Sequence, residues 1–158
     1  LGGIDILINN AGVGDFGSFE EMPVETWEKV MKVNLFGVYY VAKAALPYLK
    51  QNKEGDIVNV ASTAGLKGAP NMSAYCASKA AVISLSQSLM AELRKFNIRV
   101  ITLTPSTIAT DMSIEGKLTD GNPEKVLQPE DFAEWVRDIL KMNRRAMIAS
   151  ASIFSTNP

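Results

Sequence analysis

The sequence predicts an α/β fold in which helices cover both faces of a doubly wound parallel sheet. Three short runs rich in Ile and Val, at residues 4–10, 56–62 and 98–105, lack the polar alternation typical of half-exposed antiparallel strands. Long helix-favouring stretches at residues 24–51 and 73–95 separate these runs. Strands that alternate with helices through right-handed crossovers form a parallel sheet, so we expect all three strands to be buried on both faces.

The C-terminal third has a weaker pattern. Residues 113–126 are polar and contain glycine and proline, which predicts a loop or short helices. Helical periodicity returns at residues 128–143, where apolar side chains recur on one side. The tail at residues 145–158 is expected to supply a short final strand.

Length and composition fit one domain spanning residues 1–158. The chain has 158 residues, 47% of them hydrophobic, and a formal net charge of -1, so it can bury a core without a charge bias towards nucleic acid or anionic membranes. Its apolar runs are shorter than the ~20 residues of a membrane span, and its start lacks the features of a secretory signal. We therefore expect a cytoplasmic protein with neither a nucleic-acid nor a membrane partner.

Residue counts exclude several chemistries. The chain has no histidine and one cysteine, Cys76. This excludes Ser-His-Asp catalysis and imidazole acid–base chemistry, and no metal site is expected. A lone cysteine forms neither an internal disulfide nor a zinc cluster, which agrees with a reducing compartment, and we expect Cys76 to be a small buried side chain. Proton transfer must then use a carboxylate, a lysine, a tyrosine or water.

The ends of the expected strands are the places to look for function. Carboxyl ends of parallel strands lie at one edge of a sheet, and open α/β sheets bind ligands in the crevice outside that edge. Residues 9–12, 61–63 and 104–107 should meet there.

Tyr75 and Lys79 form the first candidate catalytic pair. Their spacing of four places both on one face of a helix, about 5 to 6 Å apart at Cβ. A free phenol has a pKa near ~10, and a neighbouring ammonium lowers it, so the pair could act as a tuned acid and base. Taken alone, the same spacing also fits an ordinary pair on a helix surface.

The other motifs of the sequence decide between the two interpretations of this pair. Stretches typical of one family follow in order across residues 4–112: "IDILINNAG", "VNLFGVYYVAKAALPYL", "GDIVNVASTAG", "YCASKAAV" and "IRVITLTPSTIATDM". The chain resembles a short-chain dehydrogenase/reductase, closest in pattern to the 3-oxoacyl-carrier-protein reductase type of fatty acid biosynthesis. The resemblance implies a Rossmann-like fold and an oxidoreductase that transfers hydride between NADP, or NAD, and a carbonyl or alcohol substrate, plausible substrates being 3-oxoacyl thioesters.

The resemblance also implies a role for each catalytic residue. Tyr75 would be the general acid that protonates the carbonyl oxygen, and Ser62 would hydrogen-bond the same oxygen. Lys79 would lower the pKa of Tyr75 and hold the ribose hydroxyls of the nicotinamide half. Asn34 would maintain a kinked helix and hold a water for a proton relay to Lys79.

Three strand ends supply the implied cofactor contacts. Residues 10–12 resemble the segment beside the adenosine ribose, and "PSTIAT" resembles a PGxxxT motif that meets the nicotinamide amide and phosphate. Ser106 stands where glycine is usual, which fits only if its φ stays negative. The implied contacts are Asn10, Ala11, Gly12, Tyr75, Lys79, Pro105, Ile108 and Thr110.

Residues 12–17 read "GVGDFG", a formal GxGxxG after a strand. A true phosphate loop opens directly into a helix at its last glycine, whereas "SFEEMP" intervenes here. We therefore predict that Gly12 contacts the cofactor only as part of "NNAG", and that Gly14 and Gly17 shape the loop.

The family's opening units have no counterpart in this chain. They comprise a strand, a glycine-rich turn and a helix, so we expect an upstream segment on the order of 70 to 90 residues, with this chain forming the C-terminal two thirds of the fold. The alternative is a shortened, non-catalytic module that acts in oligomerisation or folding. Residues 4–10 would form an exposed apolar edge, and we expect the chain to be marginally stable unless it assembles.

The two long helices resemble those of the family's dimer and tetramer contacts, so a homo-oligomer is expected. Residues 106–127 are expected to set the substrate.

Overall fold

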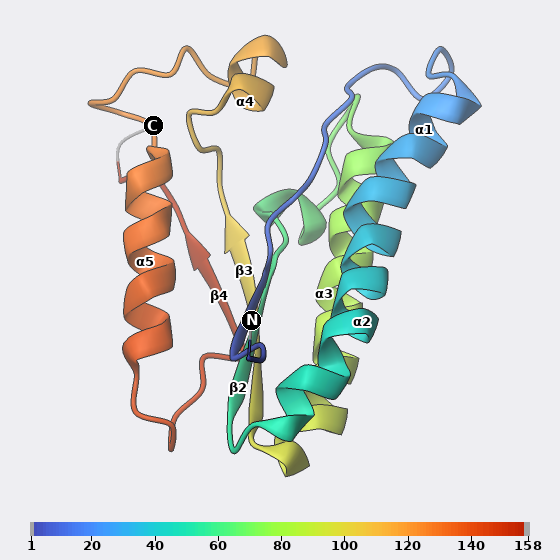
Figure 1. Cartoon of the computed structure of the whole chain (residues 1–158). Helices are drawn as coiled ribbons and strands as arrows, with labels where there is room; N and C mark the ends of the chain where they lie inside the picture. The colour runs from blue at the N-terminus through green and yellow to red at the C-terminus, as the bar shows by residue number, and fades with distance from the viewer. Residues whose placement is uncertain (1, 157–158) are drawn as a thin grey trace.

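A parallel four-stranded sheet lies between two layers of helices in the computed structural model, which describes residues 2–156 (Figure 1). The strands are β1 (Ile6–Asn9), β2 (Gly55–Val60), β3 (Ile98–Pro105) and β4 (Ser150–Ile153). Their order across the sheet follows the sequence. The predicted doubly wound parallel sheet is confirmed, and so is the short final strand.

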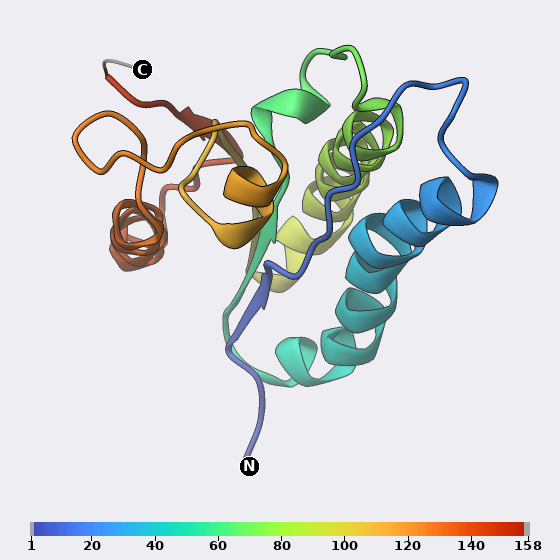
Figure 2. The same ribbon diagram turned by 90° about the horizontal axis from the view of Figure 1, so that it is seen from above.

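Helices cover the two faces unequally (Figures 1 and 2). On one face lie α3 (Ser73–Leu93) and a long helical segment made of α1 (Val24–Met31), a π-helical turn (Lys32–Phe36) and α2 (Gly37–Gln51). On the other face lies α5 (Pro129–Lys141). The short helix α4 (Asp111–Glu115) stands beyond the carboxyl end of β3, in the segment expected to hold a loop or short helices. Within residues 2–156, no helix is long and apolar enough to cross a bilayer.

Apolar side chains fill both spaces between sheet and helices. On the side of α2 and α3, a cluster of buried residues includes Leu49, Ile57 and Val100. On the side of α5, Val58 and Ile101 pack with partly buried residues such as Phe132 and Trp135. Every residue of β2 and β3 is buried, as the unbroken apolar runs predict.

The prediction that β1 is also buried on both faces is wrong. Ile6 and Ile8 are 47% and 46% exposed. In the described part of the chain β1 pairs only with β2, and α5 packs over β2 and β3 without covering this face of β1. The strand is therefore an apolar edge, as expected for residues 4–10, and it can pair with a further strand.

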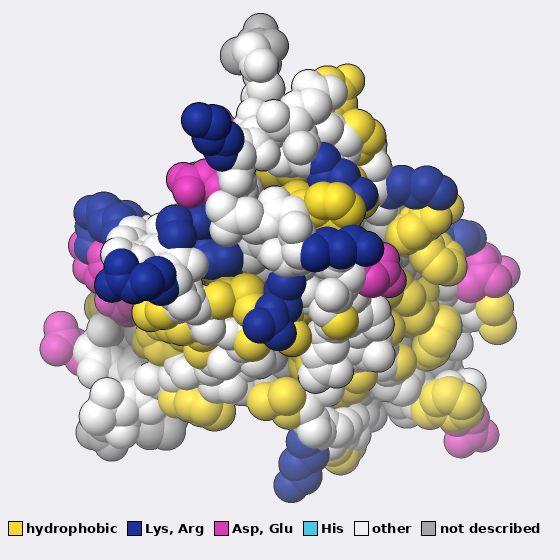
Figure 3. All heavy atoms as spheres, turned by 90° about the horizontal axis from the view of Figure 1, so that it is seen from below, with side chains coloured by type: hydrophobic (Ala, Val, Ile, Leu, Met, Phe, Trp, Pro, Cys, Tyr) yellow, Lys and Arg dark blue, Asp and Glu magenta, His cyan; other side chains and the backbone are white. Residues whose placement is uncertain are grey.

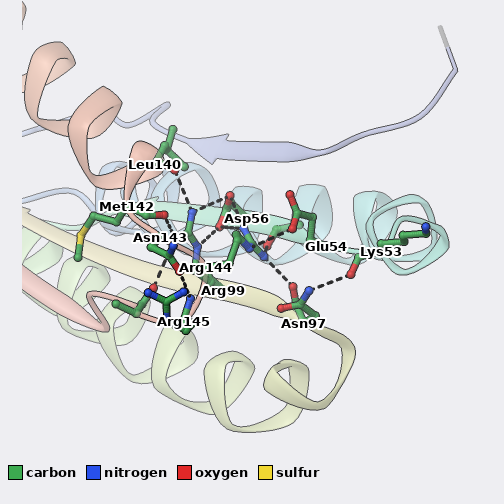
Figure 4. A network of polar contacts seen from close by, with 12 residues as sticks. Lys53, Glu54, Asp56, Asn97, Arg99, Leu140, Met142, Asn143, Arg144 and Arg145 are labelled. Atoms are coloured by element: carbon green, nitrogen blue, oxygen red, sulfur yellow. Dashed lines mark hydrogen bonds and ion pairs between the residues drawn. The ribbon is translucent and has the colours of Figure 1, made fainter.

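A buried network of ion pairs lies at the amino end of the sheet, where β2 and β3 begin (Figure 4). Arg99 of β3 donates two hydrogen bonds to the carboxylate of Asp56 in β2, at 2.6 and 3.1 Å. Arg144, after α5, donates to both oxygens of the same carboxylate at 2.9 and 2.8 Å. Arg99 also donates to the backbone carbonyls of Leu140 and Met142. The network thereby fastens the segment between α5 and β4 to the strands, at an end whose surface carries many Lys and Arg side chains (Figure 3).

Candidate active site

The carboxyl ends of the strands open into a hollow of about 640 Å³. All three strand-end segments line it, through residues such as Asn10 after β1, Ser62 after β2 and Ser106 after β3. Tyr75 and Lys79 of α3 complete the lining. The structure therefore brings the expected segments together at the predicted edge of the sheet.

Tyr75 and Lys79 lie one helical turn apart on α3. The Lys79 side chain is buried, and its Nζ donates one hydrogen bond, at 2.9 Å, to the backbone carbonyl of Val60 at the end of β2. The same nitrogen lies 5.7 Å from the centre of the Tyr75 ring. Because an ammonium carries three hydrogens, Lys79 retains donors for a ligand.

Burial shifts the pKa of both groups. It lowers the pKa of the Lys79 ammonium to about 8, since the charged form is poorly solvated in the protein. It raises the pKa of the Tyr75 phenol above its usual value, and the nearby Ser62 hydroxyl only partly offsets this rise. The pKa of the Tyr75 phenol is therefore not lowered overall as expected, because desolvation dominates and Lys79 is not hydrogen-bonded to the phenol. The phenol therefore keeps its proton at neutral pH.

Ser62 caps a single 3₁₀ turn, Thr63–Gly65, that follows β2. Its Oγ accepts a hydrogen bond from the backbone N–H of Ala64 at 3.1 Å. A Cβ atom on Gly65 would lie 2.7 Å from the carbonyl carbon and 2.8 Å from the carbonyl oxygen of Lys79. The missing side chain of Gly65 therefore lets the turn pack directly on the backbone of α3, which positions Ser62 at the hollow beside Tyr75.

Asn34 lies behind the hollow rather than in its lining. It is buried in the π-helical turn, where its Oδ1 accepts from the N–H of Val13 at 2.8 Å and its Nδ2 donates to the carbonyl of Val13 at 3.0 Å. Its Nδ2 also donates to the Oγ of Ser78 at 3.0 Å, and Ser78 in turn donates to the carbonyl of Tyr75. The expected kinked helix is thus a π-helical turn, and the amide joins it to the loop after β1 and to α3.

Sequence reasoning missed Ser78 in this chain of contacts. The residue is fully buried and directly precedes Lys79. A serine among small residues of a helix gives no local signal, because its partner Asn34 is 44 residues away.

Most of the implied cofactor residues line the hollow. They are Asn10, Gly12, Tyr75, Lys79, Pro105, Ile108 and Thr110, whereas Ala11 is not part of the lining. Thr110 also caps α4, since its Oγ1 accepts from the N–H of Ser113. Ser106 is not among the residues with positive φ, so a serine fits where the resembled motif has glycine.

The "GVGDFG" stretch is not a phosphate loop. Its last glycine does not open a helix, because α1 begins only at Val24. A Cβ atom on Gly12 would lie 3.5 Å from the Nζ of Lys79, so this glycine borders the candidate catalytic lysine. Cys76 is buried, as expected for a small core side chain.

The fold and this site define a doubly wound α/β protein with serine, tyrosine and lysine gathered at the carboxyl edge of its sheet. A family model described as short chain dehydrogenase matches residues 1–120. The chain belongs to the short-chain dehydrogenase family.

One relative carries a name that bears on activity. The chain is 38% identical over 170 residues to "Inactive 2-(S)-hydroxypropyl-CoM dehydrogenase 2" of Xanthobacter autotrophicus, covering 99% of this chain and 73% of that protein.

Solved structures share the fold over the whole chain. An alcohol dehydrogenase from Thermococcus sibiricus, complexed with 5-hydroxy-NADP, has a TM-score of 0.88 and 28% identity, covering 100% of this chain and 66% of that one. A 4-hydroxyisoleucine dehydrogenase complexed with NADH and succinate has a TM-score of 0.84 and 28% identity, covering 97% of this chain and 67% of that one. The chain spans between 51% and 73% of the length of its curated relatives.

Proposed function

We propose that the protein is an oxidoreductase that transfers hydride between NADP, or NAD, and a carbonyl or alcohol substrate. The observation that carries this proposal is the meeting of Ser62, Tyr75 and Lys79 at one hollow. The hollow combines a phenol that is protonated at neutral pH, a hydroxyl donor and an ammonium with unused hydrogens. This set of groups suits proton transfer to an oxygen atom that becomes negatively charged.

Each residue has one task in the proposed reduction. When bound, the reduced nicotinamide supplies the hydride to the carbonyl carbon. Tyr75 donates its phenol proton to the carbonyl oxygen, and Ser62 donates a hydrogen bond that stabilises the charge on that oxygen. The Lys79 ammonium favours the tyrosinate left behind and binds ribose hydroxyls through its unused hydrogens. Asn34 keeps the π-helical turn in place and holds a water through which a proton reaches Lys79.

The lining of the hollow fits a dinucleotide. Its charged members are Lys67 and Lys79, so no carboxylate opposes the phosphates. We assign the adenosine ribose to Asn10, Ala11 and Gly12. The nicotinamide amide and phosphate are assigned to Pro105, Ile108 and Thr110. The solved neighbours complexed with 5-hydroxy-NADP and with NADH support NADP, with NAD as the alternative.

The proposed substrate is a carbonyl compound of the 3-oxoacyl thioester class. Support comes from the resemblance of the motifs and from the two lysines of the lining, which favour a neutral or anionic substrate over a cationic one.

Replacement of one oxygen atom tests the proposal. We expect Tyr75→Phe in the full-length natural protein to lower kcat for acetoacetyl thioester reduction by about 10²- to 10⁴-fold, because the proton donor is lost while the ring remains. NADPH affinity, measured by fluorescence titration, should change little. Equal turnover by wild type and variant would remove Tyr75 from the mechanism.

A second candidate function is a non-catalytic module that acts in oligomerisation or folding. The relative whose printed name begins with "Inactive" favours it. Titration of the full-length protein with NADPH and NADH separates the candidates, because the module would bind neither.

Self-association and location complete the proposal. The outer side of the long helical segment exposes Phe36, Tyr39, Tyr40 and Tyr48, and Figure 3 shows apolar side chains gathered on the side of α2 and α3. We assign this side to contacts in a homodimer or homotetramer, which sedimentation would detect. The lone cysteine supports a cytoplasmic location.

A further inference from the structure

Phe16 is the aromatic neighbour of the candidate catalytic tyrosine. It belongs to the "GVGDFG" stretch after β1, which forms no phosphate loop. Its ring meets the Tyr75 ring edge-on, with ring centres 5.8 Å apart and planes at 73°. Phe16 therefore lies beside the Tyr75 ring, and both side chains line the same hollow.

Two glycines hold the Phe16 ring in this place. A Cβ atom on Gly14 would lie 2.6 Å from the Cζ of Phe16, and a Cβ atom on Gly116 would lie 2.6 Å from its Cε2. The ring can approach the backbone of both residues so closely only because neither has a side chain. Gly116 directly follows α4, so the ring also ties the loop after β1 to the segment beyond β3.

The ring lies on the boundary between two hollows. One is the hollow of about 640 Å³ that Ser62, Tyr75 and Lys79 line. The other, of about 570 Å³, is lined by the loop after β1 and by the segment around α4, including Gly14, Asp15 and Gly116. The residues shared by both linings are Gly12, Phe16 and Met112. Phe16 presents an apolar ring to the first hollow, and the second hollow behind it is lined by both polar and apolar groups.

We propose that Phe16 is the specificity-determining wall of the site, and that it restricts the reaction to carbonyl or alcohol compounds whose substituent on this side is small. The inference rests on the proposed function and adds to it a limit on the substrate class. Removal of the ring would join the two hollows, so that a bulky substituent could pass between Gly14 and Gly116 into the second one. Gly14 of "GVGDFG" would then contribute to substrate selection through the placement of Phe16.

The test compares small and bulky ketones in the full-length natural protein. For wild type and Phe16→Ala, kcat and KM are measured with 2-butanone and with 1-phenyl-2-butanone. We expect the ratio of kcat/KM for the bulky ketone to that for the small one to rise about tenfold or more in Phe16→Ala, mainly through KM. Phe19→Ala is the matched control, because Phe19 lies in the same loop but is 80% exposed and outside both linings. An unchanged ratio in Phe16→Ala, or an equal rise in Phe19→Ala, would overturn the proposal.

Binding measurements separate this proposal from the proposed function. If wild type reduces neither ketone and no acetoacetyl thioester, the proposed function fails; whenever it does not reduce the ketones, the wall is tested by ligand-observed NMR with the same two ketones. Tighter binding of the bulky ketone to Phe16→Ala than to wild type supports the wall, and equal binding overturns it. Should Phe16→Ala not fold, Phe16→Leu takes its place, since it keeps an apolar side chain in contact with both glycines, and the same rise of smaller size is expected.

Discussion

Two cations buried to the same extent lie at opposite ends of the sheet, and they differ in their hydrogen-bond and ion-pair partners. Lys79 and Arg99 are each 5% exposed. Arg99, at the amino end, is held by the Asp56 carboxylate and by three backbone carbonyls. Lys79, at the carboxyl end, has one hydrogen bond, to the carbonyl of Val60. The comparison teaches that a cation serving only the fold is paired, whereas the candidate catalytic cation keeps its donors for a ligand.

The physical cost of the two arrangements differs accordingly. Burial without a counter-ion disfavours the charged form, which is why the pKa of Lys79 falls to about 8. A paired and fully hydrogen-bonded guanidinium avoids most of that penalty. Removal of Lys79 should therefore lower activity but not stability, whereas removal of Arg99 should lower stability but not activity.

The largest effect is expected from Lys79→Met. The variant keeps a long apolar side chain but loses the ammonium, so we expect kcat/KM for the proposed reduction to fall about 10²- to 10⁴-fold. The free energy of unfolding, from urea denaturation, should stay the same or rise, because a buried charge without a carboxylate is removed. Lys29→Met, at an exposed position of α1, is the control and should change neither quantity. A large loss of stability in Lys79→Met would mean that Lys79 is a structural cation like Arg99.

Arg99→Met should have the opposite effects, with lower stability and nearly unchanged activity. Its removal leaves the buried Asp56 carboxylate with Arg144 alone and takes a donor from three backbone carbonyls, so the free energy of unfolding should fall by about 3 kcal/mol. Activity per folded molecule should stay close to that of wild type. The matched control is Arg137→Met, which removes an exposed arginine paired with Asp138 and should change the free energy of unfolding little. Equal losses in the two variants would show that burial of the ion pair has no special weight.

The pH dependence of stability gives a smaller effect. Below about pH 8, Lys79 is protonated in both the folded and the unfolded chain, and its burial penalty is present in full. Between about 8 and the usual lysine pKa of 10.5, the unfolded chain retains the proton that the folded chain has released, so stability rises with pH. From pH 7.5 to 9.5, wild type should gain about 1 to 2 kcal/mol relative to Lys79→Met in urea denaturation. Tyr75 titrates in both proteins and cancels in this difference, so parallel pH profiles would contradict the lowered pKa of Lys79.

A further effect concerns the packing of the turn that carries Ser62 on α3. In Gly65→Ala the new methyl group meets the backbone at Lys79, and overpacking of this kind should cost about 1 to 3 kcal/mol of unfolding free energy. The turn that carries Ser62 should shift with it and lower kcat. Gly68→Ala is the control, because a Cβ atom there meets nothing within 4 Å. If Gly65→Ala and Gly68→Ala have the same stability and the same kcat, the position of Ser62 does not depend on the contact between the turn and α3.

Local patterns made the carboxyl end predictable from sequence. Tyr75 and Lys79 are neighbours because a helix places every fourth residue on one face, and Ser62 joins them because parallel strands end at one edge. The amino end could not be predicted in the same way. Asp56 lies 43 residues from Arg99 and 88 residues from Arg144, and no local rule joins residues at those separations.

Other differences arise from surroundings that a sequence does not display. The direction of the Tyr75 pKa shift depends on how completely the phenol is buried, and this outweighs the ammonium nearby. The exposure of Ile6 and Ile8 depends on how far α5 extends over the sheet. The position of Phe16 depends on two glycines that lie about a hundred residues apart in the chain and meet only in the fold.

The π-helical turn at Lys32–Phe36 also constrains how this chain tolerates insertions and deletions. Such a turn holds one residue more than the α-helical path would, and each residue of an α-helix rotates its face by roughly 100°. A regular α-helix over the same residues would turn the face of α1, with Val30, by roughly 100° away from the face of α2, whereas deletion of a single residue between Lys32 and Phe36 would restore a regular helix and keep both faces aligned. The segment should therefore tolerate loss of one residue within this turn better than loss of one residue in α1 or α2, and Asn34 lies in the stretch that accommodates the extra residue.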